Sequence, residues 1–436
     1  MAHDSPTDPV ARRIALVHEL DRLLAEASEL VGREGLLGSQ KISDLVTAAE
    51  RGPVAIVNTS RWRCDALLLT LEGVSTIELP ALSLWEATQR ADRYLSVLRA
   101  AEAADVAYVR AQAVVAGEKS RVVARRVLVA GTVLERAHQR VDELLQDLQE
   151  WMWNAFAGPI VEALGFTTTP DDGTAWQRMW WCATGPLAVL PVHTAGYHDR
   201  LHEASPRTVM DRVISSYTPS VRALLEARRP HGRLVDDDGD FDRLLFVDVP
   251  DLPDEVPIDN TAERAALFAA FPADRRKVLG SNEATPEAVL AALPHHRWVH
   301  FSCHGDQDLA DPVRGGLLLR GGMLTVEALV SGRFRGDFAG LSACKTAVGG
   351  VVLLDEAITL ASALHHTGYR HVIAALWSVD NKASAEVFGQ VYRTIAADGR
   401  LSPDDAPAAL HGVIRTMRDS AAGWPHLWSP FTHTGP

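Results

Sequence analysis

Two chemically reactive side chains each follow a short apolar run in this sequence. His304 comes after the run 298–302, and Cys344 comes after the run 338–342. Each run is typical of a short buried strand, and parallel α/β sheets place their chemistry at the carboxyl ends of their strands. If the two strands are neighbours, an imidazole lies beside a thiol, which is the minimum equipment for thiolate attack on a carbonyl group.

The residues next to this pair favour catalysis over a structural role. Gly305 follows His304 and lets the backbone approach a substrate closely. The backbone N–H groups of Gly305 and Cys344 are therefore the candidates for stabilising an oxyanion. Cys344 precedes Lys345, a cationic neighbour of the kind that lowers a thiol pKa. The alternative interpretation is a strand-end histidine held by the backbone and a free thiol that faces the core.

The other cysteines and histidines fit structural roles. Cys303 is expected to face the core, because side chains alternate along a strand and its neighbour carries the chemistry. Cys64 and Cys182 are also expected in the core. The histidine pairs at 295–296 and 365–366 have no carboxylate or cysteine that completes a metal site, and there is no CxxC pair for structural zinc. We therefore expect no metal and no cofactor.

The composition is that of a soluble globular protein. The chain has 436 residues, is 47% hydrophobic and 23% charged, and carries a net charge of −13. Such a chain, without clustered Lys and Arg, does not suggest nucleic-acid binding. Four scattered cysteines fit a reducing, cytoplasmic setting. The polar residues 1–9 resemble no signal peptide, and no apolar run approaches the ~18 residues of a membrane span, so a membrane would be reached only through a partner.

The elements that must position the His/Cys pair follow from the patterning of the chain. Residues 10 to 50 have the apolar spacing of an amphipathic helix. A helical tract from 82 to 164 follows, with breaks expected near Gly117 and Gly131. Strand-like runs are expected at 53–58, 66–70, 75–79, 179–183, 185–191 and 215–219, and a helix at 220–229.

An acidic stretch at 230–242, which opens with Pro-His-Gly, is the strongest linker signal. Beyond it, strands are expected at 244–249, 277–279, 298–302, 338–342 and 372–377, and helices at 261–270, 285–292, 355–367, 382–396 and 407–419. This alternation predicts an α/β fold, with a doubly wound, mostly parallel sheet and helices on both faces. The predicted parts are a helical segment (1–50), a domain with long helices (51–235) and a second α/β domain (241–436).

Several motifs resemble the CHAT family, caspase-like cysteine peptidases of clan CD that are related to caspases and separase. The resemblance extends over roughly residues 50 to 436. Its motifs are HFSCHG at 300–305, LSAC at 341–344, ALWSVD at 375–380, WSPFTHTG at 428–435, GPVAIVN at 52–58, GPLAVLPVHTAG at 185–196 and SSYTPS at 215–220.

The resemblance implies roles for the pair and an architecture. Cys344 would be the nucleophile and His304 its general base or imidazolium partner, in the chain order that caspases also have. Residues 241–436 would be the catalytic caspase-like domain. It would pack against a degenerate, non-catalytic caspase-like domain that carries the long helices, as in separase. On this reading His193 is structural.

The resemblance also suggests a pocket for the P1 side chain of a substrate. Several relatives that cleave after basic residues carry an acidic residue after the Trp-x-Val stretch, which here is 377–379. Asp380 matches that position and would pair with a P1 Arg or Lys. Asn381 follows, where such relatives often have a second acid. Asp355 and Glu356 would shape the same pocket or cap the next helix, and the cap is the favoured role.

The expected function is that of a regulated bacterial cysteine endopeptidase. CHAT proteins are often fused to tetratricopeptide repeats or encoded beside effectors, including gasdermin-like pore formers in antiviral defence. Because this sequence has no evident repeat, a sensor or activator is expected to be a separate protein. Regulation is expected to act on the glycine-rich loop after Cys344.

Two other interpretations stay open on the sequence. A catalytically silent scaffold would use the same fold to bind a partner, since fold does not determine function. The intact His/Cys pair argues against it. A nucleotide-binding doubly wound protein is the weaker alternative, because neither a Walker A nor a GxGxxG motif is present.

Overall fold

The computed structural model describes residues 18–19, 22, 42–117, 121–171, 173–229, 243–252, 257–306, 314–342, 359–379, 381–397 and 400–436. The chain divides into two compact units, Met1–Leu45 and Val46–Pro436. The predicted helix over 10–50 lies largely outside the described residues, as does the predicted linker 230–242. Every strand that the structure describes lies in the second unit.

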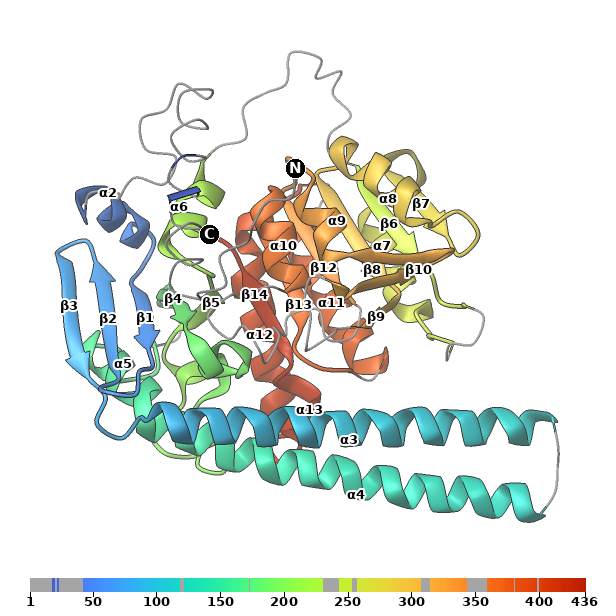
Figure 1. Ribbon diagram of the computed structural model, residues 1–436, viewed down its shortest axis with the longest axis horizontal. Helices are drawn as coiled ribbons and strands as arrows, with labels where there is room; N and C mark the ends of the chain where they lie inside the picture. Colours follow the sequence, from blue (N-terminus) through green and yellow to red (C-terminus); the bar gives the residue numbers. More distant parts are fainter. Residues whose placement is uncertain are drawn as a thin grey trace, which may run out of the picture. The chain divides into compact units, whose positions relative to one another are not determined.

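One sheet of eleven strands organises this unit, in the order β3-β2-β1-β4-β5-β14-β13-β12-β8-β6-β7 (Figure 1). Five neighbouring strands at one end are parallel, as predicted. These are β6 (Leu244–Asp248), β7 (Arg276–Gly280), β8 (Trp298–Ser302), β12 (Phe338–Leu341) and β13 (His371–Ala375).

Helices cover both faces of these five strands, because the strands are apolar on both sides. Leu245 and Val247 of β6 pack on one face with three helices, and Leu244 and Phe246 pack on the other with four. The first face carries α8 (Pro286–Ala292), α9 (Val326–Val330) and α10 (Leu360–Thr367). The second carries α7 (Thr261–Ala270), α11 (Asn381–Ile395), α12 (Ala406–Ser420) and α13 (Pro425–Trp428). Fully buried strands of this kind are typical of parallel sheets.

The other end of the sheet is built from N-terminal strands. They are β1 (Val54–Asn58), β2 (Asp65–Thr70), β3 (Gly73–Glu78), β4 (Arg178–Ala183) and β5 (Ile214–Tyr217). β1, β4 and β5 are parallel, whereas β2 runs antiparallel to both β1 and β3. The short helix α2 (Ile42–Val46) precedes β1, and α6 (Val221–Arg228) follows β5. Ser220 caps α6 through its side chain.

The C-terminal strand β14 (Phe431–Thr434) joins the two ends of the sheet. It pairs with β13 in antiparallel register over four residues, and Thr434 pairs with Tyr217 of β5 in parallel. The sequence patterns did not predict this strand. Its four residues are all buried, and Trp428 just before it is 0% exposed.

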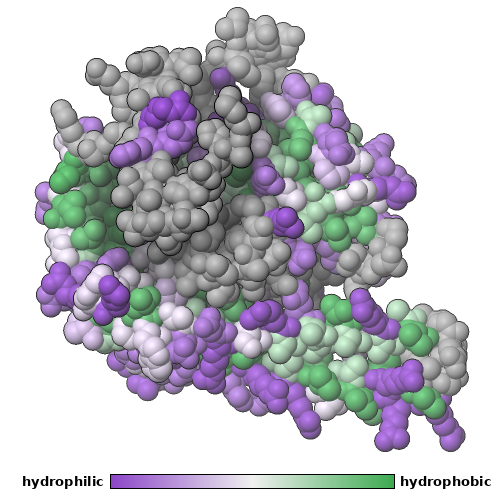
Figure 2. Space-filling view, in the orientation of Figure 1, coloured by the Kyte–Doolittle hydropathy of each residue, from purple (hydrophilic) through white to green (hydrophobic). Residues whose placement is uncertain are grey.

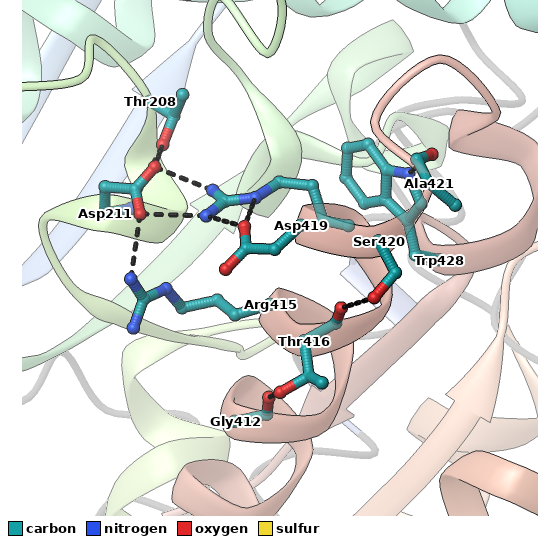
Figure 3. A network of polar contacts seen from close by, with 10 residues as sticks. Thr208, Asp211, Gly412, Arg415, Thr416, Asp419, Ser420, Ala421 and Trp428 are labelled. Carbon is teal, nitrogen blue, oxygen red and sulfur yellow. Dashed lines mark hydrogen bonds and ion pairs between the residues drawn. The ribbon is translucent and has the colours of Figure 1, made fainter. Parts of the chain in front are cut away.

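A buried ion pair also connects α12 with the segment just before β5 (Figure 3). Arg418 of α12 donates to both carboxylate oxygens of Asp211, at 2.7 and 3.0 Å, and Arg415 donates at 3.1 Å. Thr208 donates its hydroxyl to Asp211 at 2.6 Å. Burial alone raises the pKa of Asp211, but hydrogen bonds and charges from Arg418, with Thr208, hold that pKa below its usual value.

The predicted helical tract is an antiparallel hairpin of α3 (Leu84–Gly117) and α4 (Arg121–Met152), which lie side by side in Figure 1. The break at Gly117 is confirmed. The break at Gly131 is wrong, because α4 continues through it. A Cβ on residue 131 would lie 3.3 Å from the ring of Tyr108 in α3, so glycine here permits close helix packing. A π-helical turn (Trp153–Ala157) and α5 (Gly158–Ala163) follow.

The strand predicted at 185–191 is wrong. Gly185–Val189 is a 3-10 helix, which Gly185 begins with a φ of +57°.

A second, smaller sheet was not predicted. It is antiparallel and has three strands, β9 (His304–Asp306), β10 (Gly316–Leu319) and β11 (Gly322–Thr325), in the order β11-β10-β9. The sequence signal for β10 and β11 was an Arg-Gly-Gly turn between two apolar runs, a pattern typical of a hairpin.

Candidate active site

The two strands that precede His304 and Cys344 are neighbours in the sheet. β8 and β12 are parallel, and Phe301 is the register partner of Leu341. The N–H of Ser342 donates to the carbonyl of Phe301 at 2.9 Å, which continues the pairing beyond β12. The predicted adjacency of these two strands is therefore confirmed, and both strands end at the same level of the sheet.

His304 lies where the chain passes from the large sheet to the small one. β8 ends at Ser302, and two residues later His304 begins β9 and pairs with Leu318 of β10. Cys303, between them, is 1% exposed and packs in the core, as predicted. His304 and Gly305 are half-buried. The imidazole is thus carried on regular β structure at the carboxyl end of the sheet.

The small sheet is anchored by tight packing. Leu317 and Leu324 are 0% exposed. Gly316 has no room for a Cβ, which would lie 2.2 Å from the carbonyl oxygen of Leu324. The turn between β10 and β11 uses Gly321, whose φ is +84°. Glycine is needed there because other residues rarely adopt a positive φ.

A buried polar network holds the end of β8 against the first turn of α7. The hydroxyl of Ser302 donates to Glu263 at 3.0 Å and accepts from the Asn260 side chain at 3.0 Å. Asn260 also donates to Asp248, the last residue of β6, at 2.6 Å. Arg264 pairs with the second oxygen of Asp248. Because Ser302 precedes His304 by two residues, this network fixes the chain that carries the imidazole.

His300 continues the network toward α11. Its Nε2 lies 3.1 Å from Glu263, and its Nδ1 lies 3.0 Å from the hydroxyl of Tyr392. The contact of Nε2 with Glu263 lacks hydrogen-bond geometry, so the defined hydrogen bond of this imidazole is the one between Nδ1 and the Tyr392 hydroxyl. Burial first, and then the charge of Glu263, raise the pKa of Tyr392 well above its usual value, which keeps the phenol protonated.

The end of β12 is fixed in a similar way. The hydroxyl of Ser342 lies 2.7 Å from that of Ser384 in α11, and Ser384 is 9% exposed. The last described residue before Cys344 is thus tied to the helix that packs on the second face of the sheet. Sequence analysis missed both serines, because an isolated Ser carries no signal about its partner.

The other candidate site residues lie mainly outside the described part of the chain. Cys344, Asp355 and Asp380 are among the residues that the structure does not describe, and so is Glu356. Asn381 begins α11, but its side chain is not described. The N-cap of α10 is Thr359, in a capping box with Ser362, so the proposed cap by Asp355 or Glu356 is wrong for this helix.

His193 lies in the N-terminal half and is 4% exposed. Its Nδ1 lies 2.8 Å from the hydroxyl of Tyr217, which also accepts from the His193 N–H at 2.9 Å. Burial lowers the pKa of His193 to about 3. An enclosed imidazole of this kind is neutral at neutral pH, which fits the structural role expected for His193.

Within the part of the chain that the structure describes, no group of three or more His, Cys, Asp or Glu side chains is arranged to hold a metal ion. No helix described by the structure combines the length and the apolar composition that crossing a membrane requires.

Comparison with protein families identifies the fold independently. The family model for the CHAT domain matches residues 146–436, more than half of the chain. The chain belongs to the CHAT domain family. The match starts within α4 and includes β8, β9, β12 and all the resembling motifs except GPVAIVN at 52–58, which lies before it. No curated protein sequence matches this CHAT domain protein.

Known structures support the same fold. Crystal structures of the Saccharomyces cerevisiae separase–securin complex at 2.6 and 3.0 Å match 90% of the chain with a TM-score of 0.54, at 10% and 11% sequence identity. The CHAT domain protein spans 30% of the length of the chain that it matches. The likeness shows a caspase-like α/β fold with a large, mostly parallel sheet, as predicted.

Proposed function

We propose that this CHAT domain protein is a cysteine endopeptidase that uses Cys344 as nucleophile and His304 as its proton-transfer partner. One observation carries the proposal. Phe301 of β8 and Leu341 of β12 are register partners. His304 lies three residues after Phe301, and Cys344 lies three residues after Leu341. The pair therefore departs from matched positions on adjacent strands. Membership of the CHAT family, with its caspase-like fold, supports the same chemistry.

The proposed mechanism uses only groups of the chain and water. His304 takes the proton from the Cys344 thiol, and the thiolate attacks the peptide carbonyl carbon. The N–H groups of Gly305 and Cys344 stabilise the oxyanion of the tetrahedral intermediate. His304 then protonates the leaving amine as the C–N bond breaks and an acyl-enzyme remains. Water, activated by His304, hydrolyses the thioester and restores the thiol.

A basic P1 side chain is the proposed specificity. Asp380 follows β13, the strand on the other side of β12 from β8. Its carboxylate would pair with a P1 Arg or Lys, with Asn381 and Asp355 as further pocket residues. Trp377, which comes shortly before Asp380, is 5% exposed and donates its indole N–H to the His426 carbonyl at 3.2 Å. This packing supports a fixed starting point for the pocket-forming segment.

The proposed partners are proteins. Separase is matched in complex with securin, a protein partner, and a separate sensor or activator is proposed for this chain as well. The proposed substrate is a protein effector encoded beside the gene, such as a gasdermin-like pore former in bacterial antiviral defence. The cytoplasm is the proposed location.

The decisive experiment expresses the chain together with proteins encoded beside its gene and maps cleavage by mass spectrometry. Wild type is compared with Cys344→Ala, His304→Ala and the matched control Cys64→Ala, which removes a buried thiol elsewhere. Cleavage by wild type and Cys64→Ala only is expected, with Arg or Lys at P1. Asp380→Ala should then slow cleavage after basic residues.

The same experiment discriminates the scaffold interpretation. If no variant cleaves a neighbour-encoded protein, and a thiol-reactive peptide electrophile labels wild type and Cys344→Ala equally, the endopeptidase proposal fails. Retained binding of a neighbour-encoded protein by Cys344→Ala in that case would favour a silent caspase-fold scaffold.

A further inference from the structure

The hairpin of α3 and α4 changes character along its length. Near the sheet it is well packed: Tyr94 and Leu95 of α3, and Leu145 and Leu148 of α4, are at most 5% exposed. Farther out, over 105–114 and 121–140, no side chain that the structure describes is buried. We call these two segments the distal hairpin. Two helices share only one interface, so they cannot enclose a core by themselves.

Exposed aliphatic side chains gather on the distal hairpin. Leu128 is 72% exposed and Val122 64%, and three further valines are about half exposed. Figure 2 shows this apolar surface toward the free end of the hairpin, between hydrophilic patches. The three other valines are Val114 of α3, and Val129 and Val133 of α4. Val122, Val129 and Val133 share one face of α4, because their spacings of seven and four residues return to the same side of a helix.

The distal hairpin is also basic, although the whole chain carries a net charge of −13. Six arginines are exposed there, and Glu135 is its one exposed carboxylate among the residues with described side chains. In the described part of the hairpin, the ion pairs involve other residues, namely Arg90 with Glu86 and Asp147, and His138 with Asp105. The six arginines are Arg110, Arg121, Arg125, Arg126, Arg136 and Arg140.

We propose that the distal hairpin is the docking surface for an acidic amphipathic helix of a protein partner, which would complete a three-helix bundle. Its apolar stripe would cover Val122, Val129 and Val133, and its carboxylates would pair with the flanking arginines. Interfaces that exclude water around aliphatic side chains and match charge of opposite sign are typical of helix-in-groove recognition.

Two other occupants fit the surface less well. A second copy would bring one basic face against another, which like-charge repulsion disfavours. A membrane-bound helix usually inserts Trp, Phe or Leu from its apolar face. Among the described residues of the distal hairpin, the apolar side chains that are at least half exposed are three valines and one leucine, and none is aromatic. Such short branched side chains suit packing against a protein helix.

The test measures binding of a synthetic acidic amphipathic helix to the full-length chain by fluorescence anisotropy. The peptide has leucine at core heptad positions and glutamate elsewhere, and a scrambled peptide of identical composition is its control. The patterned peptide is expected to bind about tenfold more tightly than the scrambled one. The double variant Leu128→Asp/Val129→Asp and the triple variant Arg121→Glu/Arg125→Glu/Arg126→Glu should each weaken its binding by about tenfold or more.

Matched control variants make the same changes elsewhere. Leu71→Asp places a charge at another exposed leucine, which is 62% exposed, and Arg93→Glu/Arg99→Glu reverses charge on the proximal part of α3. Both controls should bind as wild type does. Circular dichroism of every variant tests that its helices remain folded.

Four results would overturn the proposal. Equal binding of the two peptides would show that the binding is nonspecific charge attraction, and so would equal losses of binding in the control variants. Binding to phosphatidylserine vesicles that the Leu128→Asp/Val129→Asp variant loses, without preference for the patterned peptide, would assign the surface to a membrane. Concentration-dependent dimerisation that the same variant abolishes would assign it to a second copy.

Discussion

Gly340 of β12 lies opposite His300 of β8, and a Cβ on residue 340 would lie 2.6 Å from Nδ1 of that imidazole. The same Cβ would lie 3.0 Å from the Tyr392 hydroxyl that bonds to His300. The bare backbone at this position therefore makes room for a hydrogen bond between the sheet and α11, directly beneath the strand ends of the candidate site.

Gly340→Ala should destabilise the protein by about 1–3 kcal/mol, because the added methyl group overpacks a site that has no room. Thermal unfolding followed by circular dichroism measures the change. The control is Gly412→Ala in the interior of α12, where a Cβ would meet nothing within 4 Å. That variant should be stabilised by up to about 1 kcal/mol through helix propensity. Equal effects of the two substitutions would contradict this account of Gly340.

Ser302→Ala should destabilise the protein by about 1–3 kcal/mol, because it leaves buried groups of Glu263 and Asn260 without their hydrogen-bond partner. Urea unfolding measures this loss. Ser331→Ala is the control, since Ser331 is exposed and donates only to its own helix. If Ser302 also positions His304, labelling of Cys344 by a peptide electrophile should slow in the Ser302→Ala variant well below its unfolding temperature. An unchanged labelling rate would limit Ser302 to a role in stability.

The Asp211–Arg418 pair should contribute to stability above acidic pH. Because the pKa of folded Asp211 is lowered, its contribution is present above the unfolded value of about 3.9 and is lost as pH falls through the folded value. Arg418→Leu should cost about 3–5 kcal/mol at neutral pH, since it leaves a buried carboxylate with one cation fewer. Asp419→Asn, which changes a carboxylate 54% exposed, should cost less than about 1 kcal/mol. Comparable losses in both variants would contradict the assigned role.

Buried histidines should make the protein sensitive to mild acid. Burial lowers the pKa of His198, His365 and His371 to about 4 each, and that of His193 and His411 to about 3. Such a group stays neutral in the folded protein while the unfolded chain takes up a proton below about pH 6.5. Stability should therefore fall as pH drops from about 6.5 toward 4, by up to about 1.4 kcal/mol per pH unit for each histidine.

Urea unfolding at several pH values between these limits tests this prediction. His411→Gln should reduce the slope of stability against pH by about one proton. The control His295→Gln changes an exposed histidine and should leave the slope unchanged. A wild-type stability that is flat over this range would show that the buried imidazoles accept protons without unfolding.

Local patterns predicted much of this fold. The helix expected at 261–270 has those bounds, and the helix expected at 285–292 is α8, which Thr285 caps through its side chain. The neighbouring strands β8 and β12 were predicted from two apolar runs, each of which continues into a residue with reactive chemistry. These features depend on residues close together in the sequence, where propensity and capping act directly.

Features that depend on distant partners were not predictable in this way. β14 is buried between β5 and β13, and its sequence FTHT has too little pattern to indicate a strand. In the sequence, Gly131 indicates a helix break, whereas in the structure it lets α4 pack closely against the Tyr108 ring. The Ser302–Glu263 and Ser342–Ser384 contacts join residues about forty positions apart. For Cys344 and Asp380, the sequence pattern and family membership remain the basis of the proposed roles.

The place of β14 in the sheet has a consequence for folding during synthesis. β5 and β13 both leave the ribosome before β14, and each presents an edge that only β14 covers in the folded chain. Open strand edges are templates for pairing with other chains. Until residues 431–434 are made, these two edges have no partner strand from the chain itself, and they are open to pairing with other chains.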